Sequence, residues 1–153
     1  MHRLSLLLAL AACAGSPPAP PAPHVASGPV HLQLLALTDF HGNLEPPSGT
    51  VHLPDGTVPA GGGAWLAAHI ARLRAEEPDA TLVVGAGDLV GASPLASALT
   101  HDEPSISLMD VLGLDVSSVG NHEFDEGVDE LLRLQRGGCR TDVPCKAPGF
   151  AGA

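Results

Sequence analysis

The sequence has no tyrosine, one tryptophan and three phenylalanines among 153 residues, so any hydrophobic core must be largely aliphatic. Basic residues are scarce too, because 7 Lys and Arg stand against 17 Asp and Glu, for a formal net charge of −10. No basic patch is visible, which argues against a nucleic-acid or anionic-membrane surface. An acidic chain that handles a phosphorylated ligand needs another source of positive charge, and bound divalent metal would supply it. The length allows one domain at most.

The N-terminal segment has the composition of a targeting signal. Residues 1–12 contain a Leu/Ala run that is too short to span a bilayer and is typical of a secretory signal. The run ends in small residues before Cys13, a pattern that resembles a bacterial lipobox, in which this cysteine carries the lipid; an ordinary cleaved signal is the alternative. Residues 13–29 are rich in Pro and Ala and predict an extended tether before residues 30–153. We therefore expect an exported lipoprotein of the periplasm or cell envelope, with membrane contact only through its lipid.

Only three cysteines are present, and two of them remain if Cys13 is lipidated. Cys139 and Cys145 then form a closely spaced pair, which predicts a small disulfide loop in an oxidising compartment. Two free thiols are the alternative. A metal site is less favoured, because no histidine or second cysteine pair lies nearby.

Apolar runs and helical segments alternate along the rest of the chain. Strands are expected at 30–38, 80–86 and 115–119, a long loop at 39–59, and helices at 64–76, 94–99, 103–112 and 127–136. This order predicts an α/β fold with a parallel sheet and right-handed crossovers. In such sheets, ligands bind outside the carboxyl ends of the strands.

Each expected strand ends in side chains that bind metals. Asp39-Phe40-His41 follows the first strand, Gly87-Asp88 the second, and residues 120–125 (Gly-Asn-His-Glu-Phe-Asp) the third. Asp39 and His41 are two residues apart, so in extended backbone both side chains would point the same way. A carboxylate at Asp88 can bridge two ions, and residues 121 and 122 add an amide oxygen and an imidazole. Mixed O and N donors suit Zn, Mn, Fe, Co or Mg.

Each cluster also has a purely structural interpretation. Asp39 could belong to a turn with Gly42-Asn43, and Gly87-Asp88 could be a turn after a strand. Asn121 could cap a helix, and the acidic residues after it could complement the helix dipole. The remaining histidines lack such a context and are not expected to be ligands.

Taken together, the three clusters resemble the calcineurin-like metallophosphoesterases, which carry Asp-x-His, Gly-Asp and Gly-Asn-His-Glu at successive strand ends. Within that superfamily, residues 121–125 (Asn-His-Glu-Phe-Asp) resemble the bacterial 5′-nucleotidase/UDP-sugar hydrolase group, as do Gly61-Gly62 and residues 91–94 (Gly-Ala-Ser-Pro). The resemblance covers roughly residues 34–136. It implies the four-layer α/β/β/α fold of that superfamily and hydrolysis of phosphoesters of small molecules such as nucleotides.

The resemblance also implies a role for each matching residue. Asp39 and His41 would bind one divalent ion (Zn, Mn, Co or Mg), Asp88 would bridge two ions, and Asn121 would bind the second. His122 would stand beside the phosphate as the catalytic imidazole. Its orienting partner would be Asp125. Two such ions clamp a phosphate and lower the pKa of a bridging water.

This chain departs from the family in one respect. The family completes its metal shell with histidines from later strands and binds its nucleotide through a C-terminal domain, whereas no histidine follows His122 here. We therefore expect the N-terminal part of a metallophosphoesterase domain, incomplete at its C-terminus, with an open sheet edge and little activity alone.

Other functions remain open on the sequence alone. A 2′,3′-cyclic phosphodiesterase and a sulfur-compound hydrolase belong to the same superfamily. A nucleotide-binding module without hydrolysis is suggested by Gly85-x-Gly87-x-x-x-Gly91, although this spacing misses the dinucleotide pattern. A lipoprotein that keeps the metal residues only as relics is the third class.

Overall fold

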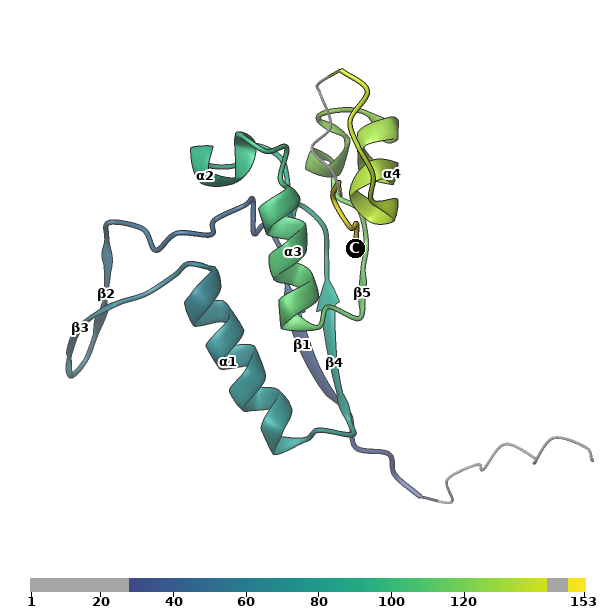
Figure 1. Cartoon of the computed structure of the whole chain (residues 1–153). Coiled ribbons are helices and arrows are strands. Elements are labelled where there is room, and N and C mark those ends of the chain that lie inside the picture. The colour runs from purple at the N-terminus through teal and green to yellow at the C-terminus, as the bar shows by residue number, and fades with distance from the viewer. Residues whose placement is uncertain (1–27, 143–148) are drawn as a thin grey trace, which may run out of the picture. The chain divides into compact units, whose positions relative to one another are not determined.

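Three parallel strands form the main sheet of the computed structural model, which describes residues 28–142 and 149–153 (Figure 1). The strands are β1 (Gln33–Leu37), β4 (Thr81–Gly85) and β5 (Val116–Ser117), in the order β1-β4-β5. β4 pairs in parallel with both neighbours. The expected parallel α/β sheet is therefore confirmed.

The helices occupy the expected segments, each within one residue of the expected bounds. They are α1 (Gly63–Glu76), α2 (Leu95–Ala98), α3 (Glu103–Leu112) and α4 (Val128–Arg136), and a 3₁₀ turn, η1 (His122–Phe124), precedes α4. α1 links β1 to β4, and α2 and α3 link β4 to β5. Proline and glycine set the bounds of α3: Pro104 occupies its first turn, and Gly113 ends it at φ 67°, donating its N–H to the carbonyls of Met109 and Asp110.

The middle segment and the strand lengths differ from the sequence expectation: β1 covers 33–37 instead of 30–38, and β4 covers 81–85 instead of 80–86. The segment expected as one long loop contains an antiparallel hairpin, β2 (Thr50–Leu53) and β3 (Gly56–Pro59), in which Leu53 lies opposite Gly56. The local signal for this hairpin was the turn at residues 54–55, just before Gly56. The segment was interpreted as a loop because it is rich in Gly and Pro, which are typical of loops. Strand β5 has two residues instead of five, because only Val116 and Ser117 pair with β4.

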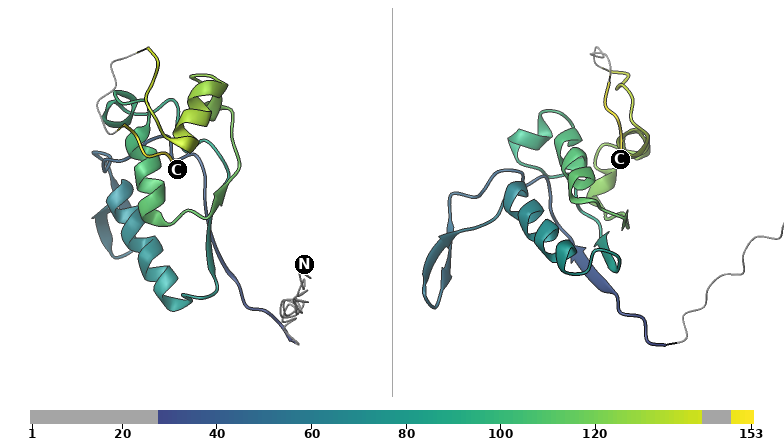
Figure 2. Two further views of the ribbon diagram at one scale, coloured as in Figure 1. Left: turned by 45° about the vertical axis from the view of Figure 1, so that its right-hand side comes forward. Right: turned by 60° about the horizontal axis from the view of Figure 1, so that its bottom comes forward.

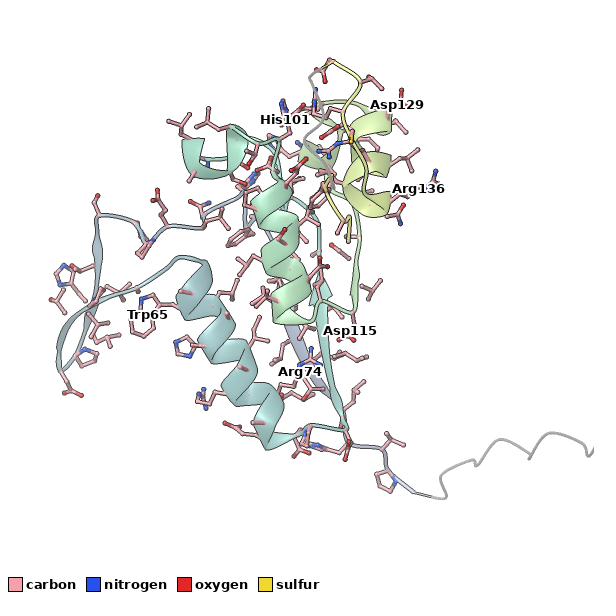
Figure 3. All side chains as sticks on the ribbon, viewed as in Figure 1. Trp65, Arg74, His101, Asp115, Asp129 and Arg136 are labelled. Atoms are coloured by element: carbon pink, nitrogen blue, oxygen red, sulfur yellow. The ribbon has the colours of Figure 1, made fainter. Side chains whose placement is uncertain are left out.

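The core lies between the sheet and helices α1 and α3, which cover one face of it (Figure 2). It is aliphatic, as the composition requires, and its buried members are Ile70, Val83, Leu89, Met109 and Leu112. The chain's single tryptophan stays outside this core: Trp65 is 48% exposed and lies on the side of α1 nearer the hairpin (Figure 3).

The opposite face of the sheet is apolar and uncovered by the described residues. Leu34 is 59% exposed, its neighbour in register, Leu82, is 39% exposed, and Val116 is 62% exposed. The alternation along β1 explains the two faces, since Leu35 and Leu37 turn toward the core while Leu34 and Ala36 turn away.

Several expectations lie outside the described residues: the signal peptide at 1–12, lipidation of Cys13, nearly all of the tether at 13–29, and Cys145. Cys139 is disulfide-bonded. The described residues from His31 onward belong to one compact unit. In the described part of the chain, none of the helices combines the length and the hydropathy that crossing a bilayer demands.

Candidate metal centre

The three polar clusters lie on loops that leave the carboxyl edge of the main sheet. Asp39 and His41 follow β1, Asp88 follows β4, and Asn121 and His122 follow β5. The loops are joined through their backbones, because the His41 N–H donates to the Asp88 carbonyl at 3.1 Å. Asp88 in turn accepts the backbone N–H of His122 at its Oδ1, at 3.0 Å. Segments far apart in the sequence thus meet at one edge of the sheet.

His41, Asp88 and His122 form the tightest group. One potential ligand atom from each lies within 4.8 Å of those of the other two. The two imidazole rings meet edge to face, with centroids 4.8 Å apart and an interplanar angle of 79°. Asp39 approaches from the side of His41, with its Oδ1 3.9 Å from the His41 Nε2. Carboxylate oxygens and imidazole nitrogens together are donors that Zn, Mn and Co accept.

The orientation of His41 fits a metal ligand. Its Nδ1 lies 2.8 Å from the carbonyl oxygen of Gly91, so Nδ1 carries the proton and donates it in a hydrogen bond. The lone pair is then on Nε2, the nitrogen nearer Asp39. Metal-binding histidines characteristically donate their other ring N–H to a carbonyl or carboxylate, which fixes the tautomer. The donor set therefore fits a divalent cation at this point.

The backbone at these residues is not extended, which corrects the sequence argument for Asp39 and His41. Asp39, His41 and Asp88 have φ values of 51°, 46° and 52°, in the left-handed region. For residues other than glycine, this conformation costs on the order of 1 kcal/mol and is concentrated at functional sites. The side chains of Asp39 and His41 therefore approach each other through left-handed backbone turns. The alternation of side chains along an extended strand, on which the sequence argument relied, does not occur here.

Asn121 precedes η1, yet its side chain makes no capping hydrogen bond, so the helix-cap interpretation is wrong. Its side chain is exposed on the loop that carries His122. Gly87 and Gly120 allow this loop to approach the loop after β4. A Cβ on Gly87, which has φ 93°, would lie 2.8 Å from the Gly120 Cα, and a Cβ on Gly120 would collide with the Asp88 carboxylate.

Glu123 holds the two loops together, a role that the sequence interpretation missed. Its carboxylate accepts the backbone N–H groups of Asp88 at 2.9 Å, Leu89 at 2.7 Å and Gly120. Glu123 also lies in the first turn of η1, where the alternative interpretation placed it, but its carboxylate does more than complement a helix dipole. The sequence signal was only its place beside a ligand cluster, since the three N–H partners come from loops that the fold brings together.

His122 is held by Asp125, whose Oδ2 lies 2.8 Å from the imidazole Nδ1. This hydrogen bond is the main cause that raises the pKa of His122 above its ordinary value. The negative charges of Asp125, Asp88 and Glu123 act in the same direction, and desolvation opposes them. The arrangement favours a protonated imidazole that faces the His41 and Asp88 ligand atoms.

The other described histidines make different contacts. His101 pairs with Glu126 at 2.8 Å in the region between α2 and α4 (Figure 3). His52 contacts the Thr57 hydroxyl across the hairpin at 3.0 Å, and His69 is exposed on α1. In the described ranges, none of these joins a group of potential metal ligands.

Comparison with known proteins finds relatives that include an endonuclease and a probable 5′-nucleotidase. An uncharacterised protein of Acinetobacter calcoaceticus is 47% identical over 133 residues, which cover 80% of this chain and 65% of that protein. Endonuclease YhcR of Bacillus subtilis is 42% identical over 130 residues, 80% of this chain and 10% of its own. A probable 5′-nucleotidase of Treponema pallidum is 38% identical over 108 residues, which cover 69% of this chain and 18% of that protein. This chain thus spans less than two thirds of each.

Solved structures similar to this chain include two nucleotidases. An NAD nucleotidase of Haemophilus influenzae superposes with a TM-score of 0.57 at 29% identity, over 69% of this chain and 20% of that one. A 5′-nucleotidase precursor from Thermus thermophilus gives a TM-score of 0.55 at 29% identity, over 65% and 19%. No protein-family model matches the chain.

Proposed function

Because this chain belongs to the 5′-nucleotidase family of calcineurin-like metallophosphoesterases, a family of hydrolases, we propose that the protein hydrolyses phosphate esters of nucleotides with the help of two divalent metal ions. The observation that carries the proposal is the convergence of His41, Asp88 and His122, each of which brings one nitrogen or oxygen atom within 4.8 Å of those of the other two, so that His122 lies beside two of the proposed metal ligands. Nucleotides and nucleotide sugars are the substrates we propose, in keeping with the nucleotidases and nucleotide phosphoesterase among its relatives.

The charge of the site supports a metal-dependent function. Asp39, Asp88, Glu123 and Asp125 all lie at or beside the cluster, and among the described residues no lysine or arginine forms an ion pair with any of them. A phosphate would therefore be repelled by the bare site. Bound divalent ions would supply the missing positive charge and lower the pKa of a bound water. A module that holds nucleotide without metal is disfavoured for the same reason.

We assign the first ion to Asp39 and the Nε2 of His41, and the second to Asn121, with Asp88 between the two. The fixed tautomer of His41 supports its part, since Nδ1–H is committed to Gly91. The Asn121 side chain makes no cap bond that would compete with an ion. This donor set is small for two ions, so we propose that the 153-residue chain alone holds them weakly.

His122 serves as the general acid in this proposal. Its Nδ1 is bonded to Asp125, so its Nε2 is the atom that would donate a proton to the leaving oxygen. The raised pKa of His122 favours the protonated form that this role requires. Asp125 orients the ring, and Asp88 accepts the backbone N–H of His122, which fixes the loop beneath it.

We also propose that the protein is exported and that Cys13 carries a lipid. Its relatives include a cell wall protein of Listeria monocytogenes, 39% identical over 121 residues. Metabolic labelling with a radioactive fatty acid tests this proposal, because Cys13→Ser would remove the label.

The hydrolytic function is tested with a panel of substrates: 5′-AMP, a UDP-sugar, 2′,3′-cyclic AMP and a thiosulfate ester. Each is assayed with Mn²⁺, Co²⁺ or Zn²⁺ and again with EDTA, on this chain and on any longer product of the same gene. Metal-dependent release of phosphate from 5′-AMP or the UDP-sugar is the expected result. Turnover of the cyclic or sulfur substrate alone would reassign the substrate, and nucleotide binding that persists in EDTA would refute the metal role.

Two variants separate the metal ligands from the acid. Asp88→Asn keeps a residue that tolerates left-handed backbone but removes the charge, so we expect activity and metal occupancy to fall together. His122→Ala should retain metal and lose turnover. Asp110→Asn, exposed on α3, is the matched control and should change neither. Full metal occupancy in Asp88→Asn would refute the bridging role, and loss of metal in His122→Ala would make His122 a ligand.

A further inference from the structure

Gly91 is hydrogen-bonded on both sides of its Cα, and each bond leads to a different part of the molecule. Its carbonyl accepts the Nδ1–H of His41 at 2.8 Å. Its N–H donates to the Oδ2 of Asp102 at 2.9 Å. Two hydrogen bonds, one on each side of the Gly91 Cα, therefore link the Asp102 carboxylate to the imidazole of His41.

Asp102 is buried, with 7% of its surface exposed, and it does not cap the helix that it precedes. Its Oδ1 instead accepts the hydroxyl of Ser97 at 2.6 Å, and Ser97 in turn bonds to Ser105 at 2.6 Å. Both serines are fully buried. Among the described residues, no arginine, lysine or histidine pairs with this carboxylate. A buried carboxylate without a cation is costly, so its hydrogen bonds to Gly91 and Ser97 must offset that cost.

Gly91 also lies against the catalytic pair. It has φ 81°, and a Cβ at this position would lie 2.8 Å from both the Cβ of His122 and the Oδ2 of Asp125. A movement of the Gly91 backbone would therefore displace the hydrogen-bond acceptor of His41 and press on His122. Residues from three loops meet at this one glycine.

We propose that Asp102 is a positioning residue of the metal centre: its buried carboxylate, fixed by Ser97, holds Gly91 so that the Gly91 carbonyl orients His41 with Nε2 toward the metal. The metal-binding part of this inference rests on the proposed function. The orientation of His41 does not, because the hydrogen bonds are formed by the protein itself. A purely structural role, in which Asp102 only joins α2 to α3, is the competing explanation.

The tautomer of His41 in the metal-free protein is the direct test. Long-range ¹H–¹⁵N NMR spectra at pH 8.5 distinguish the Nδ1–H tautomer, which we expect for His41 in the wild type, from the Nε2–H form. Asp102→Ala should convert His41 to a mixture of the two. Loss of a hydrogen bond that orients a ligand commonly weakens metal binding about 10- to 100-fold, so we expect a fall of that size in Co²⁺ affinity. Asp102→Asn, which keeps one acceptor oxygen, should lie between.

Thr81→Val is the matched control for lost stability. Thr81 is also 7% exposed, and its hydroxyl lies within hydrogen-bonding distance of the Glu77 carbonyl and Gln33 at the amino end of β4. This variant should lower the unfolding midpoint without changing the His41 tautomer or the Co²⁺ affinity. If Asp102→Ala does the same, the positioning role is refuted.

Two further outcomes are decisive. If Asp102→Ala does not fold, Ser97→Ala, which leaves the carboxylate in place but removes its Oδ1 donor, gives the same readout in the same direction. If the wild type binds no Co²⁺, the proposed function fails, and the tautomer of His41 alone decides whether Asp102 positions it. An unchanged tautomer in every folded variant overturns the inference.

Discussion

At the scale of single residues, His122 is bonded to two carboxylates that act on different atoms. Asp125 accepts from its ring and Asp88 accepts from its backbone. The ring contact is the main reason why the pKa of His122 is raised. A group whose pKa is raised by folding contributes stability that is present below its unfolded pKa and is lost as the pH rises through the folded value.

Asp125→Asn should lower the pKa of His122 in the metal-free protein toward its ordinary value. The hydrogen bond to a charged acceptor and the nearest negative charge are both lost, and Asp88 and Glu123 leave only a residual increase. NMR titration of the His122 ring protons measures this shift. Asp129→Asn, an exposed acidic residue of α4 labelled in Figure 3, should leave the titration unchanged. An unaltered midpoint in Asp125→Asn would show that the contact does not persist in solution.

At this scale, the sequence is most informative where neighbours in the chain make the contact. The hydrogen bond between His122 and Asp125 spans three residues, so it falls within the motif on which the resemblance rests, while the catalytic role of the pair stays a prediction. The roles of Glu123 and Asp102 were missed because their partners come from loops distant in sequence. Their carboxylates accept backbone N–H groups, which nearly every residue type provides, so the partner residues show no recognisable sequence pattern. The left-handed backbone at Asp39 and His41 was missed for a related reason, since neither residue type requires it.

At the scale of elements, the site depends on how closely the loops after β4 and β5 approach each other. Glycines on both sides, Gly87 and Gly120, leave room for this contact, and Glu123 closes it with hydrogen bonds to both loops. The expected order of strands and helices was confirmed because long periodic segments determine it. The β2–β3 hairpin was missed because all its residues are exposed, so no buried face produced a pattern.

Gly87→Ala should separate these two loops and reduce both stability and metal affinity. Its Cβ would meet the backbone of Gly120, which cannot move aside as a flexible side chain could. Gly127→Ala provides the control, because Gly127 has a similar φ, 87° against 93°, but nothing within 4 Å of an added Cβ. Overpacking of this kind costs about 1–3 kcal/mol, so urea denaturation should show Gly87→Ala less stable than Gly127→Ala by that amount. Equal losses would mean that backbone strain alone matters.

At the scale of the whole molecule, helices α1 and α3 cover one face of the main three-stranded sheet. The four-layer fold that the sequence resemblance implies would have a second sheet next to the first, and the apolar face formed by Leu34, Leu82 and Val116 is the face on which we expect such a sheet to pack. In β1 and β4, the residues on the exposed face are apolar, as are most of those on the buried face. Such a continuous apolar run predicts a strand covered on both faces, so the sequence could not show that the described residues leave one face uncovered.

The exposed sheet face should make the 153-residue chain self-associate and bind hydrophobic dyes, because contiguous apolar patches on a surface favour association. The double variant Leu34→Thr/Leu82→Thr removes two neighbouring apolar side chains in register and introduces threonine, a β-branched residue that suits a strand. We expect lower dye fluorescence and a larger monomer fraction in light scattering. Val111→Thr is the control, since Val111 is 76% exposed but lies on α3, outside the sheet. If both variants reduce dye binding and self-association equally, general surface hydrophobicity drives association. If only the double strand variant reduces them, the chains associate through this sheet face.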